Sequence, residues 1–163
     1  MKQSTLDGLN FLVEASLERD VWDELAMLLF TREGEDADTL VLLNGTGNPA
    51  DALPDIARAI AAGGFPAPTD GVTGIIFFVE AWNLKSRIDE KETLEADVDA
   101  LHEMGRNVGD HPDATEMKGW YAIDSEGTTA RIFERGASEV IIPPKGTSSI
   151  PENLKLLLDA VTA

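Results

Sequence analysis

The chain contains no cysteine, and this absence excludes several kinds of chemistry. Disulfide bonds, thiolate nucleophiles, iron–sulfur clusters and cysteine-based structural zinc sites all need residues that the sequence does not have. Imidazole is almost as scarce, because His102 and His111 are the two histidines in 163 residues. An imidazole group can therefore come only from these two side chains.

Basic residues are also few, with 13 Lys and Arg against 30 Asp and Glu and a formal net charge of −17. A field of this sign repels phosphate backbones, so we expect no direct binding of nucleic acid. Three explanations of the acidity stay open. It can keep a solvated, salt-adapted surface soluble, meet a basic protein partner, or mimic DNA with two rows of carboxylates.

Long apolar runs are absent, and no stretch approaches the roughly 20 residues that span a bilayer. We therefore expect no membrane segment. Residues 1–12 have no uninterrupted apolar core and no small-residue cleavage site of the kind found in secretory signals. The sequence predicts a cytoplasmic protein, in the host cytoplasm if a phage encodes it.

Nucleotide and nucleophile motifs are missing too. The chain has no G-x-x-x-x-G-K-[ST] phosphate loop and no G-x-S-x-G elbow around a serine. Residues 45–50 match G-x-G-x-x-A, but they follow the second arm of an expected hairpin, whereas a dinucleotide fingerprint follows the first strand of a parallel unit. We expect a glycine-rich turn there, and no cofactor and no metal.

What the sequence does contain is a regular alternation of helical and strand patterns. Apolar residues at helical spacing predict helices, and short β-rich runs bounded by Gly, Pro and Asp predict strands. The expected helices are 4–19, 51–62, 89–104 and 149–161, and the expected strands are 25–31, 39–43, 73–82, 118–124, 128–134 and 139–142.

This order predicts one α/β (α+β) domain over residues 1–163. We expect a sandwich in which helices flank a mixed, mainly antiparallel sheet of about five strands. The near-continuous apolar run of residues 74–79 indicates a central strand buried on both faces. The last helix, with its Ser149-Ile150-Pro151-Glu152 capping box, should pack back on the sheet.

Glu80 ends the buried run and raises the main functional question, because an acid closes the strand next to Trp82. Three interpretations stay open. Glu80 can contact a ligand at the strand end, point to water, or act structurally. In the structural case it would accept backbone amides of the 109–112 loop, or pair with Arg87 or Arg106.

His111 is the other candidate, since it lies between Asp110 and Asp113 and a few residues before Glu116. A histidine beside carboxylates can serve as a general base or a metal ligand, although His111 can equally be a turn residue that bonds a backbone carbonyl. Glu80, His111 and Glu116 are the catalytic candidates, and Glu80, Trp82 and His111 the binding candidates.

Three short motifs carry a resemblance: Glu80-Ala81-Trp82 at a strand end, His111-Pro112 followed by Glu116, and Asp124 with Gly127 at a turn. The chain resembles a family of small uncharacterised proteins from actinobacteria and their phages, with E-[AG]-W, H-P-x-x-x-E and D-x-x-G patterns over about residues 72–135. The resemblance implies a fold and a source, but no reaction.

The leading hypothesis is a non-enzymatic accessory protein of bacterial or phage origin that acts through a protein partner. The alternatives are a small-ligand protein or hydrolase with a Glu80, His111 and Glu116 pocket, and a DNA mimic. The oligomeric state is open, a dimer included. We expect Glu80 and Trp82 to anchor the strand end against the 111–112 loop.

Overall fold

The structure is a computed structural model of the whole chain. It describes residues 1–34, 37–41, 49–64, 70–84, 114–146 and 148–163, and within these ranges the side chains of residues 40–41 and 82–84 are left undescribed. The predicted helix 89–104 and the glycine-rich turn lie outside the described residues, apart from Pro49 and Ala50 at the end of that turn.

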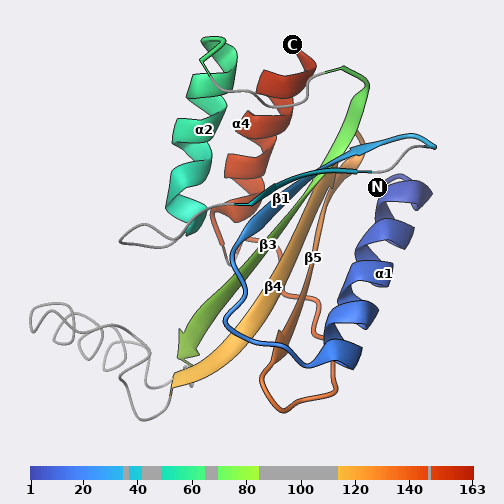
Figure 1. Cartoon of the computed structure of the whole chain (residues 1–163), viewed down its shortest axis with the longest axis vertical. Helices are drawn as coiled ribbons and strands as arrows, with labels where there is room; N and C mark the ends of the chain where they lie inside the picture. Colours follow the sequence, from blue (N-terminus) through green and yellow to red (C-terminus); the bar gives the residue numbers. More distant parts are fainter. Residues whose placement is uncertain (35–36, 42–48, 65–69, 85–113, 147) are drawn as a thin grey trace, which may run out of the picture.

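A five-stranded sheet with helices on both faces forms the fold, which confirms the predicted single α+β architecture (Figure 1). The strands lie in the order β2-β1-β3-β4-β5, and every pairing between them is antiparallel. Helix α1 covers one face, and α2 and α4 lie side by side on the other. The strands are β1 (Met27–Arg32), β2 (Asp38–Val41), β3 (Val72–Leu84), β4 (Ala114–Asp124) and β5 (Gly127–Glu134); the helices are α1 (Gln3–Arg19), η1 (Pro49–Ala52), α2 (Leu53–Ala61) and α4 (Ile150–Thr162).

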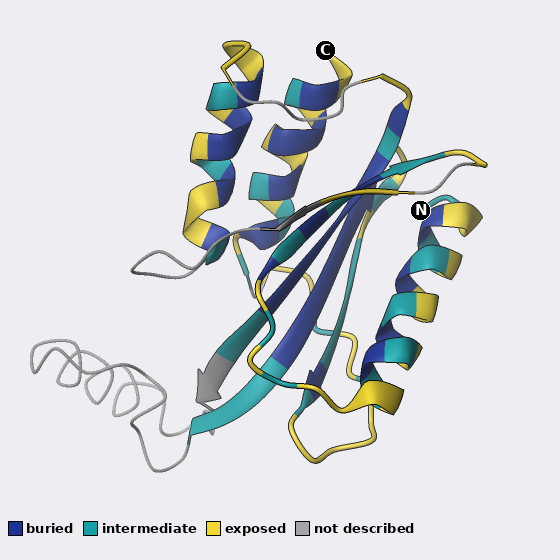
Figure 2. Cartoon of the chain, in the orientation of Figure 1, coloured by how far each residue is buried: buried dark blue, intermediate teal, exposed yellow. Residues whose placement is uncertain are grey.

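Strand β3 is the central strand, as its apolar run predicted, and it is among the most buried parts of the chain (Figure 2). Successive side chains of a strand point to opposite faces. Ile75, Phe77 and Val79 therefore join the core under α2 and α4, whereas Ile76 and Phe78 join the core under α1. The next residue on the α1 side is Glu80, so the strand period itself directs the acid toward that helix.

Polar groups hold α1 on the sheet at both ends. The backbone N–H of Lys2 donates to Asp124 Oδ2 at 2.8 Å, which fixes the start of the helix to the β4–β5 turn. Near the other end, buried Ser16 contacts Lys118 of β4. The buried face of α1 runs from Thr5 through Leu9 and Val13 to Ser16, so both of its ends are polar.

Two local predictions were wrong. Residues 139–142 form no strand but make a single bridge, Ile141 with Ile132, because Pro143 and Pro144 follow and cannot donate to a ladder. Ser149 makes no side-chain cap; Ser148 Oγ instead accepts the N–H of Ile150.

Gly74 lies where β3 passes closest to its neighbours. A Cβ on this residue would lie 2.8 Å from Thr31 Oγ1 and 2.9 Å from the carbonyl oxygen of Ile123. The second contact is with backbone of the adjacent strand, which cannot move without disturbing the ladder.

We therefore expect Gly74→Ala to lower the free energy of unfolding by about 1–3 kcal/mol, measured by chemical denaturation. Gly8→Ala is the matched control. A Cβ there meets nothing within 4 Å, so this helical glycine should gain roughly 0.5–1 kcal/mol. Equal effects of the two changes would contradict the close-packing argument.

Candidate functional site

Glu80 and Lys118 lie directly opposite each other in the β3–β4 ladder, on the side of the sheet that faces α1. Both side chains extend toward the segment that joins α1 to β1. We call residues 20–25 of this segment the 20–25 loop, and we call Glu24, Glu80 and Lys118 the clasp. Sequence distance concealed this arrangement, because the loop and Glu80 are separated by more than fifty residues.

The Glu80 carboxylate binds the loop through its backbone. The N–H of Asp23 donates to Oε2 at 2.9 Å, and the N–H of Glu24 donates to Oε1 at 3.1 Å. Glu80 thus has a structural role, as one interpretation of the sequence allowed, and it holds the 20–25 loop; a contact with the 109–112 segment lies outside the described residues and stays a prediction. Each carboxylate oxygen already accepts one hydrogen bond.

Lys118 supplies the positive charge of the clasp and is 0% exposed. Its ammonium donates to the Val21 carbonyl oxygen, to Glu24 Oε2 at 2.9 Å and to Ser16 Oγ at 3.3 Å. Glu80 Oε1 lies 3.8 Å from the same nitrogen. Because an ammonium has three N–H donors, all of them are used.

Trp22 is the aromatic residue of the 20–25 loop, and two cations lie over its ring. Lys118 Nζ is 4.9 Å from the ring centroid, and the Arg135 guanidinium carbon is 5.4 Å from it. Arg135 also pairs with Glu116 at 2.7 Å. Trp22 therefore links the buried charge of the clasp to an exposed ion pair.

Two residues of the loop are strained. Asp20 has φ 46° and Asp23 has φ 64°, both in the left-handed region that non-glycine residues seldom adopt, although Asp tolerates it better than most. These residues flank Val21 and Trp22. Such conformations persist where surrounding contacts determine them, and the clasp supplies those contacts.

Burial raises the pKa of the Glu80 carboxyl above its ordinary value of 4.5. The backbone N–H of Glu24, the Lys118 ammonium and the N–H of Asp23 oppose this effect without cancelling it, and the charge of Glu116 adds to the rise. The neutral form of Glu80 is therefore favoured more in the folded protein than in the unfolded chain.

Three carboxylates approach one another beside the clasp. One oxygen from each of Asp23, Glu80 and Glu116 lies within 4.8 Å of the others. Carboxylate oxygens are ligands for hard divalent cations, yet here Glu80 binds backbone amides and Glu116 binds Arg135. The protein's own donors already occupy two of the three acids, so this group does not carry a metal assignment.

The structure places only some of the sequence-predicted candidate residues close to one another. The structure brings Glu80 and Glu116 together, and Trp82 pairs with Glu116 in the β3–β4 register, although nothing is described of its side chain. His111 lies outside the described residues, as does the 111–112 loop, so the predicted contact of the strand end with that loop stays a prediction.

Lys118, Trp22 and Asp20 are site residues that the sequence reasoning missed. A lone lysine at the start of the apolar run Gly119–Ile123 was the available signal, because a strand that enters a core with a charge needs a counter-charge across the ladder. The pattern Asp-Val-Trp-Asp after a helix was a weaker signal for a tight turn.

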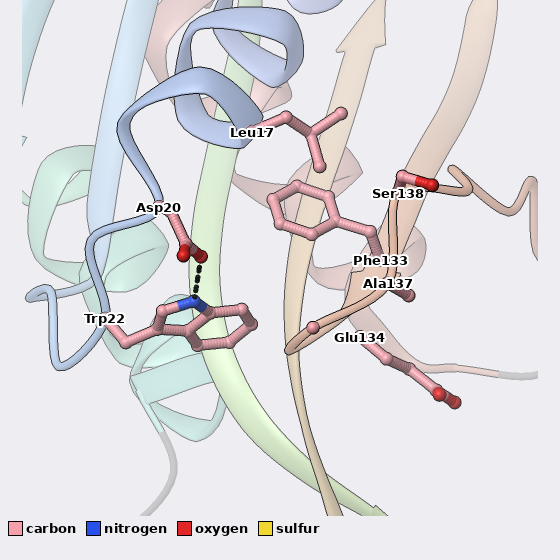
Figure 3. A pocket seen from close by; sticks show the side chains of 8 residues that line it. Leu17, Asp20, Trp22, Phe133, Glu134, Ala137 and Ser138 are labelled. Atoms are coloured by element: carbon pink, nitrogen blue, oxygen red, sulfur yellow. Dashed lines mark hydrogen bonds between the residues drawn. The ribbon is translucent and has the colours of Figure 1, made fainter.

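A cavity of about 280 Å³ opens next to the clasp, between the end of α1 and the end of β5 (Figure 3). Trp22 and Phe133 form its aromatic wall, with ring centroids 6.2 Å apart at an interplanar angle of 81°. Asp20 lies at its rim and accepts the Trp22 Nε1–H at 3.1 Å. The cavity is lined by Leu17, Asp20, Trp22, Phe133, Glu134, Gly136, Ala137 and Ser138.

Lys118→Met should lower the free energy of unfolding by about 3 kcal/mol, because it leaves Glu24 and Glu80 without their buried counter-charge. Lys155→Met is the matched control, since Lys155 pairs with Asp159 on the exposed surface of α4 and should cost less than about 0.5 kcal/mol. Urea denaturation measures both. If Lys118→Met lowered the free energy of unfolding as little as the control does, the clasp would not stabilise the fold.

Glu80→Gln tests the raised pKa. A raised folded-state pKa contributes stability that is present below pH 4.5 and is lost as the pH rises through the folded value. The glutamine variant lacks this contribution. Its side chain also has one oxygen instead of two, so one backbone N–H of the loop loses its acceptor, which lowers the free energy of unfolding by about 1–3 kcal/mol. Unfolding of both proteins between pH 4 and pH 7 should show the larger difference at pH 4, and a difference that grows toward pH 7 would contradict the direction of the shift.

No protein-family model, curated protein or solved structure matches this chain. In the described part of the chain, no helix is both long and apolar enough to cross a membrane. The resemblance to the actinobacterial and phage proteins stays a prediction, and a function must be inferred from the geometry and charge of the site itself.

Proposed function

We propose that this chain is a non-enzymatic, acidic accessory protein of bacterial or phage origin that binds a protein partner in the cytoplasm through the 20–25 loop. The observation that carries the proposal is that the clasp fixes the backbone of the 20–25 loop. The charged groups of the clasp bind the backbone of this exposed, strained loop at three residues, Val21, Asp23 and Glu24.

The loop presents apolar side chains to solvent while its backbone is fixed. Val21 is 47% exposed and Leu25 is 38% exposed. Binding surfaces gain affinity when they are ordered before the partner arrives, because less conformational freedom is lost on association. A rigid loop with exposed apolar residues beside an aromatic cavity has the features of such a surface.

The charge of the chain supports a basic partner. With a net charge of −17, long-range attraction would speed association with a positively charged surface and would weaken as salt is added. Among the explanations of the acidity, this one is a surface that meets a basic protein partner. The 20–25 loop is where we place the contact with that partner.

A small-ligand or hydrolase function has one observation in its favour, the approach of Glu80 to Glu116 with a raised Glu80 pKa. Groups with raised pKa values serve as general acids in many enzymes. Against this, both Glu80 oxygens accept hydrogen bonds from backbone N–H groups. A ligand that bound to Glu80 would therefore release the loop. Partner binding uses the arrangement as it stands.

The test is affinity capture from the native host with wild-type bait and two variants. Val21→Ser removes an apolar contact of the loop, and Leu156→Ser removes an equally exposed leucine of α4 on the opposite side of the sheet, 53% exposed. We expect Val21→Ser to reduce recovery of the specific partner about tenfold, and Leu156→Ser to leave it unchanged.

Quantitative mass spectrometry would measure recovery at low and high salt, with an unrelated acidic protein as a second bait. Recovery of the partner should fall as salt rises. The proposal fails if the acidic control bait captures the same proteins, or if both serine variants reduce recovery equally.

A further inference from the structure

We infer that the cavity between Trp22 and Phe133 is a receptor for one basic side chain, a lysine or arginine of the partner. The inference rests on the proposed function and deepens it, because it names the chemistry that the partner would insert. It is carried by the shape of the cavity, its aromatic wall and the carboxylate at its rim (Figure 3).

The cavity has the size for a side chain. Its volume of about 280 Å³ is just below the roughly 300–1,000 Å³ found for small-molecule pockets. Leu17, Phe133 and Ala137 provide apolar surface along which the methylene groups of a lysine or arginine can lie.

The aromatic wall attracts positive charge. Aromatic ring faces carry a negative quadrupole, and tryptophan binds cations better than the other aromatic side chains. The protein itself already places Lys118 and Arg135 over the Trp22 ring. Neither of these cations is among the residues that line the cavity.

Asp20 supplies the counter-charge at the rim. Its Oδ1 accepts the Trp22 indole N–H, and its negative charge also acts on Arg135. The left-handed backbone of Asp20 fixes this carboxylate next to the ring. Glu134 also lines the cavity, but Figure 3 shows its carboxylate directed away from Trp22.

An aromatic wall with one carboxylate selects a cation over an apolar group or an anion. A norleucine side chain would fill the same space without the charge, and an acidic side chain would meet Asp20 and the net charge of −17. The site should therefore distinguish a charged side chain from an uncharged one of similar length, and peptides that differ in this charge can be compared directly.

The experiment follows the indole N–H resonance of Trp22 by ¹H–¹⁵N NMR while capped tripeptides are added to the full chain. The probes are Ac-Gly-Lys-Gly-NH₂, its arginine analogue, and its norleucine analogue as the uncharged match. We expect saturable shifts with the lysine or arginine peptide, with a dissociation constant on the order of millimolar, and no saturable shift with norleucine.

Two variants test the assignment of the site. Asp20→Asn keeps an acceptor for the indole and a residue that tolerates the left-handed region, so it should fold normally and weaken binding about fivefold. Ala137→Leu should block the cavity without altering charge. Asp7→Asn is the matched control, because it removes one acid from the opposite end of α1 and should change binding by less than roughly twofold.

Equal shifts with norleucine would make the cavity an apolar site, and equal binding by Asp20→Asn and wild type would reduce it to diffuse charge attraction. Either result overturns the inference. If the peptides fail but the host partner still depends on Val21, the proposed function survives without this receptor. If the peptides bind but no partner depends on Val21, the receptor stands and the proposed function fails.

Discussion

Lys118 carries its charge at a position that solvent does not reach, and the arrangement around it follows from that constraint. An ammonium removed from water needs all three donors satisfied and a negative charge nearby. Val21, Ser16 and Glu24 accept its hydrogen bonds, and Glu80 lies across the ladder. One buried charge thus fixes the end of α1, the loop after it and the relation of both to the sheet.

The same constraint explains why the acids at the end of β3 do not form an open reactive group. Both oxygens of Glu80 accept hydrogen bonds from backbone N–H groups of the loop, and one oxygen of Glu116 accepts a hydrogen bond from Arg135. On a chain with 30 acids and 13 bases, clusters of carboxylates arise readily, and what separates a functional cluster from a structural one is whether its oxygens are already bonded. In this cluster both oxygens of Glu80 are bonded, so the loop that Glu80 holds is a better candidate for function than Glu80 itself.

The loop and the cavity beside it form one unit. Trp22 contacts Lys118 on the buried side and contributes to the cavity wall with Phe133 on the exposed side. Asp20 and Asp23, both in left-handed conformations, bend the chain around it. A change in the clasp should therefore be felt at the cavity as well as in stability, because the same indole ring takes part in both.

The fold class and the central place of β3 could be predicted from residue patterns alone. Continuous apolar character over residues 74–79 requires burial on both faces, and helical spacing in 150–161 requires a face that packs on the sheet; both follow from local pattern and the need to remove apolar surface from water. The tertiary structure alone decided the partners of Glu80. Period-two geometry directs its side chain to one face, but which amides lie there depends on how α1 and the 20–25 loop cross the sheet. Hydrogen bonds and ion pairs between residues so distant along the chain leave no periodic signal, because they are set by the packing of whole elements.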